Sequence, residues 1–288
     1  IPEALLEGMS FDLQNEVNRR LDAVEGLLPE LQRLLTTMQE EDLQIRTKST
    51  RRDLVTKADV ASEETILHFL RSLFPGDAIL AEESGQHQAL SSSVPVSGLT
   101  WCIDPVDGTV NYAHGLPLYA VSFGLLFENE PVGGLVFLPA LNDTYRGAVQ
   151  SGATKNGRPI RVSPNTDLES ALIVTGFPYR RQEMIDILTG SLRGVLLNAR
   201  GIRRTGSAAL DLCWVAEGRF DGHYEWNLSP WDTCGALTIL REAGGTATNL
   251  KGEHFRLEEK MLVATNGFVH EQLRTTLIEA GASEPHAE

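Results

Sequence analysis

Residues 101–112 read Trp101-Cys102-Ile103-Asp104-Pro105-Val106-Asp107-Gly108-Thr109-Val110-Asn111-Tyr112. The apolar start of this stretch predicts the end of a buried strand. Asp104 then opens a turn in which Pro105 fixes φ and Gly108 allows an unusual backbone angle. Because Asp104 and Asp107 leave the same turn, both carboxylates can point at one place, where their repulsion requires protons or a cation. Such oxygen ligands suit Mg²⁺ or Mn²⁺ better than zinc.

The same residues are compatible with an ordinary surface turn, because Asp-Pro and Asp-Gly pairs are common turn formers. Two further acidic residues favour the metal site. Glu82 follows a predicted strand at residues 78–80, at the edge where open α/β sheets place ligands. Asp232 is expected in the first turn of a helix that starts at Pro230 with Ser229 as its N-cap, although the helix dipole alone would explain an acid there. Together the carboxylates can surround two or three divalent ions, as hydrolytic phosphate transfer requires.

Charge and composition limit the classes of partner. The 288-residue chain has a net charge of −14 and a pI near 5.0, which argues against nucleic acid or an anionic membrane as the main partner. No apolar run reaches the ~18 residues of a membrane span, and no secretory pattern is visible. The three cysteines lack CxxC spacing, so we expect reduced core residues and a cytoplasmic location.

The N-terminal region predicts helices and a basic loop. Apolar residues recur at steps of three and four from Val17 to Met38, which indicates one helical stripe, or a short coiled coil. Gly26 and Pro29 interrupt the stripe, so a kink or two helices are expected. Residues 45–53 are rich in Lys, Arg, Ser and Thr and predict an exposed loop that can act as a mobile flap. Another helix is predicted to open at Ser62.

The two halves of the chain show different strand patterns. Residues 119–127 and 132–138 predict a hairpin, with residues 145–149 as a third strand. From Ala171 onward short strands alternate with helices, which is typical of α/β folds. The later strand candidates are residues 172–175, 201–205 and 261–264.

The fold class is therefore α/β. We expect an α+β subdomain at residues 1–165 that carries most of the metal ligands. An α/β subdomain at residues 166–288 is expected to carry Asp232 and the contacts to the substrate alcohol. The two subdomains are predicted to pack as one catalytic unit.

Three separated segments of the chain resemble the inositol monophosphatase family of Mg²⁺-dependent, lithium-sensitive phosphatases. The resemblance runs from about Lys48 to about Asn266, and its Asp-Pro-hydrophobic-Asp-Gly-Thr core is highly specific. It implies a layered αβαβα sandwich, as in inositol monophosphatase and fructose-1,6-bisphosphatase, and a homodimer. The segments are residues 81–84 (Ala-Glu-Glu-Ser), residues 101–112, and Trp231-Asp232 followed by residues 242–245 (Glu-Ala-Gly-Gly).

This resemblance also implies a metal site and a catalytic pair. Asp59 would pair with the Thr109 hydroxyl to orient and deprotonate the attacking water, and Glu82 belongs to the catalytic group as well as to the ligands. Lys48 either matches a family lysine near a third metal or is an ordinary solvated lysine. The implied ligands of two or three Mg²⁺ ions, with Mn²⁺ as a substitute, are Glu82, Asp104, Asp107, Asp232 and the backbone carbonyl of Val106.

The substrate contacts come from the same resemblance. Backbone amides of Gly108 and Thr109 would hold the phosphate. The turn that contains Ser207 and Ala208 would approach the alcohol part of the substrate, and Glu225 would accept a hydrogen bond from a substrate hydroxyl.

The expected activity is hydrolysis of a phosphate monoester of a small alcohol by metal-activated water. myo-Inositol monophosphate is our first choice, with histidinol phosphate, fructose 1,6-bisphosphate and 3′-phosphoadenosine 5′-phosphate open. The bulky Trp226 beside Glu225 departs from the inositol-type pattern and bears on substrate identity. Haloacid-dehalogenase-like phosphatases are a rival class, but Pro105 stands where their nucleophilic aspartate would be. A non-enzymatic binding protein is disfavoured because all four carboxylates are present.

Overall fold

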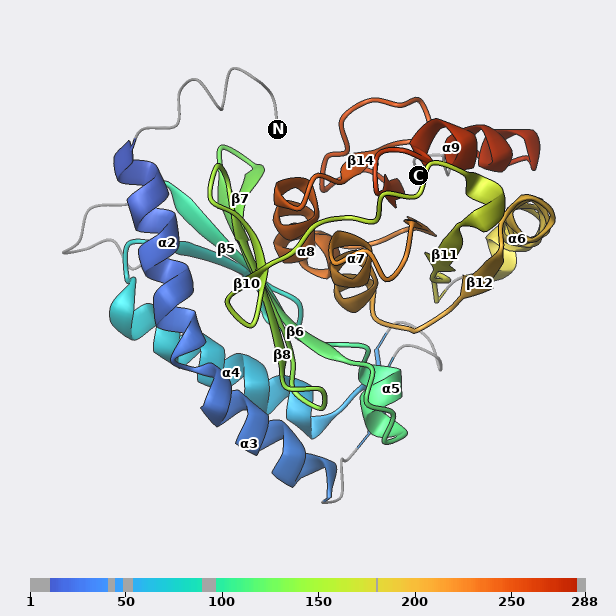
Figure 1. The fold of residues 1–288 in the computed structure, drawn as a ribbon. Helices are drawn as coiled ribbons and strands as arrows, with labels where there is room; N and C mark the ends of the chain where they lie inside the picture. The colour runs from blue at the N-terminus through green and yellow to red at the C-terminus, as the bar shows by residue number, and fades with distance from the viewer. Residues whose placement is uncertain (1–10, 41–44, 49–53, 90–96, 180, 284–288) are drawn as a thin grey trace.

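The computed structural model describes residues 11–40, 45–48, 54–89, 97–179 and 181–283 (Figure 1). Within these residues the strands form an eight-stranded sheet, a five-stranded sheet and a two-stranded ribbon. Helices cover the outer face of each large sheet, and a further helical layer lies between the sheets (Figure 1). The molecule is therefore the layered αβαβα sandwich that the family resemblance implies. No helix in the described part of the chain is long and apolar enough to cross a membrane.

The eight-stranded sheet has the order β10-β9-β8-β7-β6-β5-β3-β4. Only β3 and β5 pair in parallel, and the other neighbours are antiparallel, which confirms the predicted hairpin and third strand. The strands are β3 (Ala78–Ala81), β4 (Gly85–His87), β5 (Leu99–Asp107), β6 (Ala120–Phe127), β7 (Glu130–Leu138), β8 (Asp143–Ala148), β9 (Gly152–Lys155) and β10 (Arg158–Pro159).

Residues 104–107, Asp-Pro-Val-Asp, continue strand β5 and do not end it. Pairing with β6 is regular up to Asp104, shifts register, and resumes at Asp107 opposite Ala120. Pro105 lies within the irregularity, where it has no N–H to contribute to the ladder. The prediction of a turn immediately after Ile103 was therefore wrong, because a bulge bends the strand there.

Helices on the outer face of this sheet confirm the amphipathic stripe. The stripe forms α2 (Phe11–Glu25) and α3 (Leu28–Gln39), separated at Gly26. The next helix, α4 (Lys57–Leu73), begins five residues before the predicted start at Ser62. The reason is a capping box in which Thr56 and Asp59 satisfy the first backbone amides.

The five-stranded sheet has the order β12-β11-β13-β15-β14. The predicted strands are confirmed within two residues at each end, whereas β13 and β14 were not predicted. The strands are β11 (Leu172–Thr175), β12 (Gly201–Arg203), β13 (Gly222–Trp226), β14 (Thr246–Thr248) and β15 (Met261–Thr265). On its outer side lie α6 (Ile185–Asn198) and α9 (His270–Glu279), and the short helices η1 (Leu168–Ser170) and η2 (Arg181–Met184) precede α6 (Figure 1).

The middle layer consists of α7 (Ala208–Ala216) and α8 (Pro230–Glu242). Although α8 belongs to the second half of the sequence, it packs on strands of the first sheet. A Cβ atom added to Gly134 would lie 2.0 Å from the carbonyl oxygen of Gly235, and one added to Gly235 would lie 2.6 Å from the carbonyl oxygen of Phe123. The backbone of α8 therefore packs directly on the backbone of the sheet. The predicted boundary between two subdomains at residues 165/166 stays a prediction.

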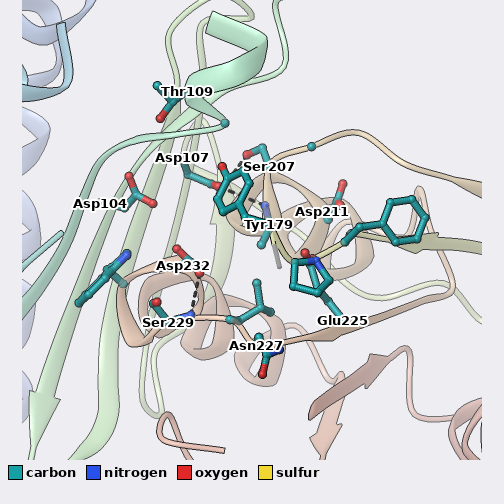
Figure 2. Close-up of a pocket in the computed structure, with 18 of the residues that line it drawn as sticks. Asp104, Asp107, Thr109, Tyr179, Ser207, Asp211, Glu225, Asn227, Ser229 and Asp232 are labelled. Carbon is teal, nitrogen blue, oxygen red and sulfur yellow. Dashed lines mark hydrogen bonds between the residues drawn. The ribbon is translucent and has the colours of Figure 1, made fainter. Parts of the chain in front are cut away.

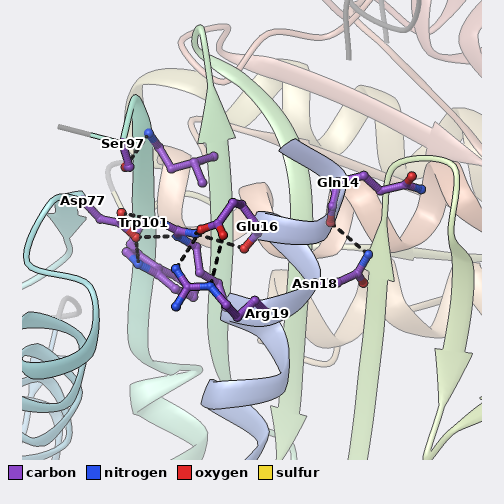
Figure 3. Close-up of polar contacts among 9 residues, drawn as sticks. Gln14, Glu16, Asn18, Arg19, Asp77, Ser97 and Trp101 are labelled. Atoms are coloured by element: carbon purple, nitrogen blue, oxygen red, sulfur yellow. Dashed lines mark hydrogen bonds and ion pairs between the residues drawn. The ribbon is translucent and has the colours of Figure 1, made fainter. Parts of the chain in front are cut away.

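A buried ion pair attaches α2 to the first sheet. Arg20 donates through Nε and Nη2 to the two carboxylate oxygens of Asp77, each at 2.7 Å. The indole Nε1 of Trp101 on β5 donates to the same carboxylate at 2.9 Å, and Glu16 accepts a further bond from Arg20 (Figure 3). Because both partners are buried, removing one leaves an uncompensated charge.

We predict that Gly134→Ala lowers the free energy of unfolding by roughly 3 kcal/mol, the upper end of the usual overpacking penalty, because the methyl group meets backbone that cannot rotate away. Urea unfolding measures the change. Gly201→Ala is the matched control, since its nearest contacts are at 3.7 and 3.9 Å and its φ is not positive. Equal midpoints for the two variants would contradict the close contact.

Asp77→Ala is expected to cost about 3–5 kcal/mol of stability, because the Arg20 guanidinium stays buried without its counter-ion. Thermal unfolding of this variant is compared with that of Asp22→Ala, which removes an exposed partner of Arg146. A loss no greater than that of Asp22→Ala would show that α2 is held by its apolar face alone.

Candidate active site

A pocket of about 450 Å³ lies where β5, α7, β13 and α8 converge (Figure 2). It brings together nearly all the residues that the sequence selected, although they come from both halves of the chain. Asp59 is the exception and lies behind the pocket wall. The predicted residues that line the pocket are Lys48, Glu82, Asp104, Val106, Asp107, Gly108, Thr109, Ser207, Ala208, Glu225 and Asp232.

The acidic side chains of the pocket repel one another. Burial raises the pKa of Asp104 well above its ordinary value, and the charges of Glu82, Asp107 and Asp232 raise it further. Burial also raises the pKa of Asp107 to about 6 and that of Asp232 well above the usual range. Figure 2 shows Asp104, Asp107 and Asp232 on the same side of the pocket. Such a group requires protons or a cation to compensate its charge.

Asp107 is fixed by the start of α7. Its carboxylate accepts hydrogen bonds from the Ser207 hydroxyl at 2.6 Å and from the Ala209 amide at 2.7 Å, with the Ala208 amide at 3.3 Å. Ser207 is the N-cap of α7, so one residue both caps the helix and orients the carboxylate. Ser207 and Ala208, expected beside the substrate alcohol, thus also connect the two halves of the site.

Asp104 and Asp232 are oriented by their own backbone. The Val106 amide donates to Asp104 Oδ1 at 3.0 Å across the bulge. The Ser229 amide donates to Asp232 Oδ2 at 2.7 Å at the start of α8, as the predicted helix start requires. Each carboxylate therefore keeps further lone pairs for a cation.

The hydrogen bond expected between Asp59 and Thr109 is present. The Thr109 hydroxyl donates to Asp59 Oδ1 at 2.9 Å and also contacts the Val106 carbonyl at 3.1 Å. Asp59 accepts two more bonds from Thr56, one from the amide and one from the hydroxyl. Burial nevertheless raises the pKa of Asp59 above its ordinary value.

Lys48 is not an ordinary solvated lysine. Its ammonium group lies 2.8 Å from Glu82 Oε1 and 2.5 Å from Glu83 Oε1. Burial lowers the pKa of Lys48, but the two ion pairs outweigh it and raise the pKa overall. Beside it, β1 (Arg46–Thr47) pairs with β2 (Leu54–Val55), so part of the predicted loop is a ribbon. Residues 49–53 of the predicted flap lie outside the described residues.

The donor chemistry of the pocket fits a hard divalent cation. All the candidate side-chain ligands are carboxylates, the donors that hard divalent cations prefer, and burial and mutual repulsion raise the pKa values of Asp104, Asp107 and Asp232. In the described parts of the chain, no three His, Cys, Asp or Glu side chains are already arranged to hold a metal ion. The ammonium of Lys48 supplies positive charge beside Glu82 in this structure.

Sequence reasoning missed several residues of the pocket. Asp211 lies one helical turn after Ser207 on α7, and this i, i+4 spacing was the available signal. Arg204, Phe177 and Tyr179 also line the pocket, but no local pattern distinguishes them from other loop residues. Trp226 borders the pocket with its indole 1% exposed and donating Nε1–H to the Ser283 carbonyl, which leaves little of the ring for a substrate.

The predicted role of the cysteines as core residues agrees with the structure. Cys102, Cys213 and Cys234 are free and buried. Burial raises the pKa of the Cys213 thiol well above its ordinary value, so the group is protonated and unreactive.

Residues 18–284 match the model of the inositol monophosphatase family. The chain belongs to that family. It is 41% identical over 234 residues to an inositol-1-monophosphatase of Synechocystis sp., covering 81% of this chain and 80% of that protein. It is 42% identical over 221 residues to a putative Nus factor SuhB of Neisseria meningitidis serogroup B, covering 77% and 83%.

A solved structure of inositol monophosphatase from Anabaena (Nostoc) sp. PCC 7120 has the same fold. It superimposes with a TM-score of 0.81 at 37% identity, covering 92% of this chain and 97% of that chain. These similarities identify this member of the inositol monophosphatase family as a phosphatase, a hydrolase of phosphoric monoesters.

We predict that Asp104→Asn reduces turnover by about two orders of magnitude or more while the protein stays folded, because the carboxylate repels its neighbours and does not stabilise the core. Thermal unfolding without added metal is expected to show an unchanged or higher midpoint. Asp12→Asn, an exposed change of the same charge on α2, is the control. Near-normal turnover of Asp104→Asn would refute the assignment of this residue.

Proposed function

We propose that this phosphatase is Mg²⁺-dependent and hydrolyses the phosphate monoester of a small polyol, with myo-inositol monophosphate as the first substrate to test. The observation that carries this proposal is the hydrogen-bonded pair of Thr109 and Asp59 at the edge of a carboxylate-lined pocket. A hydroxyl held by a buried carboxylate can orient a water molecule and pass its proton inward. The carboxylates beside it are suited to the charge of metal ions and not to that of the phosphate.

The ligand set would consist of Glu82, Asp104, Asp107 and Asp232 with the Val106 carbonyl. Two or three Mg²⁺ ions, or Mn²⁺, bound there would lower the pKa of a water molecule and offset the charge on the phosphate oxygens. The net charge of −14 makes such compensation necessary for an anionic substrate.

The chain itself would orient the water and the phosphate. The Thr109 hydroxyl donates a hydrogen bond to Asp59, so its oxygen lone pairs would be free to accept a hydrogen bond from a water molecule in the pocket. Asp59, with its raised pKa, would take up the proton that the water releases. The amides of Gly108 and Thr109, at the start of α5 (Thr109–Ala113), would donate to phosphate oxygens.

The alcohol would lie toward the second sheet. Glu225 on β13 lines the pocket, and burial raises its pKa to about 8. The Glu225 carboxyl lies directly against Gly176, where an added Cβ would lie 1.9 Å from Glu225 Oε1. From the pocket wall this carboxyl would accept a hydrogen bond from a substrate hydroxyl. Histidinol phosphate, fructose 1,6-bisphosphate and 3′-phosphoadenosine 5′-phosphate stay the alternatives.

Several expectations beyond the chemistry stay predictions. They are a homodimer, a cytoplasmic location, lithium sensitivity and no binding of nucleic acid or membrane. The relative named as a putative Nus factor makes nucleic-acid binding worth measuring. The acidic surface of this chain argues against it.

We predict rapid phosphate release from myo-inositol 1-phosphate when Mg²⁺ is present, and none after chelation. Phosphate is measured at one fixed enzyme concentration, with the other three esters in parallel. Release from another ester alone would change the substrate and keep the chemistry. No release from any ester with Mg²⁺ or Mn²⁺ would overturn the proposed function.

The same preparation tests the mechanism. Acid quenching during turnover should trap no phosphate on the protein, because water is the proposed nucleophile. A stable phosphorylated aspartate would favour the rival haloacid-dehalogenase-like chemistry.

A further inference from the structure

His223 is a buried polar side chain whose two ring nitrogens have no hydrogen-bond partner. It lies on β13 between Val174 of β11 and Ala264 of β15, and its side chain has no exposure to solvent. Both Nδ1 and Nε2 lack a partner in the structure. A buried imidazole left this way costs free energy, so such a residue calls for an explanation.

Two carboxyls that line the pocket lie within 4 Å of this ring. His223 Nε2 lies 3.5 Å from Glu225 Oε2, and Nδ1 lies 3.9 Å from Asp211 Oδ2. Glu225 follows His223 by two residues on the same face of β13, whereas Asp211 comes from α7 above that face. Figure 2 shows Asp211 and Glu225 at the same end of the pocket. His223 itself does not line the pocket.

The protonation of His223 and Asp211 suits a chain of hydrogen bonds from Asp211 through His223 to Glu225, and Glu225, whose pKa burial raises to about 8, accepts at a carboxyl oxygen whether or not it is protonated. Burial lowers the pKa of His223 to about 3, so the ring is neutral and has one donor and one acceptor. Burial raises the pKa of Asp211 well above its ordinary value, so this carboxyl can donate a proton. Its other oxygen, Oδ1, accepts a bond from the Thr205 hydroxyl at 2.5 Å and is thereby oriented.

We propose that His223 is a positioning residue for the substrate alcohol. In this arrangement the Asp211 carboxyl donates a hydrogen bond to His223 Nδ1, and His223 Nε2–H donates one to Glu225. Glu225 is thereby oriented to accept a hydrogen bond from a hydroxyl of the substrate. The present separations of 3.5 Å and 3.9 Å are longer than hydrogen bonds, so the proposal requires both carboxyls to move closer to the ring when substrate binds. This inference rests on the proposed function and deepens it. His223 would thus favour substrates that carry a hydroxyl group although it does not touch the substrate.

The kinetic test compares two phosphate esters. His223→Phe keeps the size of the ring and removes both nitrogens. We expect it to raise KM for myo-inositol 1-phosphate about tenfold, the loss typical of one hydrogen bond. The kcat/KM for p-nitrophenyl phosphate, which has no alcohol hydroxyl, should stay within about twofold. His223→Gln, which keeps a donor and an acceptor, should recover most of the selectivity.

Tyr224→Phe is the matched control, because it removes a buried, unpartnered hydroxyl from the adjacent residue on the opposite face of β13. It should leave the ratio of the two kcat/KM values unchanged. An equal loss towards both esters in His223→Phe, or no loss in either, would show that His223 only fills the core.

A second measurement needs no turnover. Imidazole ¹⁵N spectra of the whole protein, assigned by the signals that disappear in His223→Gln, should show a neutral ring protonated at Nε2. Glu225→Gln should shift the Nε2 signal, and Asp211→Asn should shift Nδ1. Unchanged signals in both variants would refute the inference even in an active phosphatase. If the signals shift but the protein has no phosphatase activity, the hydrogen bonds from Asp211 through His223 to Glu225 are supported and the proposed function is refuted.

Discussion

The close contact of α8 with the first sheet is the constraint on which the site depends. At Gly134 and Gly235 a strand and a helix meet without intervening side chains, and Gly124 leaves similar room for Cys234. Asp232 lies one turn before Gly235 on the same helix. The depth of this packing therefore sets how near Asp232 comes to the carboxylates of β5. Because packed backbone is stiff, the position of the helix is transmitted to the site almost rigidly.

The acidic pocket opposes folding in the absence of a cation. Buried carboxylates such as Asp104 and Asp232 have raised pKa values because the charged form is both desolvated and repelled. The surrounding structure retains them through specific bonds, such as those from α7 to Asp107. The pocket therefore lowers stability locally, which is the usual relation between stability and activity at functional sites.

Local sequence was informative wherever a residue acts through its immediate neighbours. Gly26 and Pro29 separate two helices as predicted, and Ser229 places the start of α8. The start of α4 was misplaced because the capping box of Thr56 and Asp59 was not recognised. Pro105 was taken as the centre of a turn because periodicity does not distinguish a turn from a bulge within a continuing strand.

The sequence by itself determined the family, the fold class and the identity of the carboxylates, since the motif around Asp104 is contiguous and specific. Only the tertiary structure decided which distant groups meet. The Ser207 hydroxyl reaches Asp107 across 100 residues, and Asp211 comes within 3.9 Å of His223 from another element. Strand β13, which carries Glu225, was not predicted. Its partners β11 and β15 are remote in sequence, and their pairing, not local periodicity, makes it a strand.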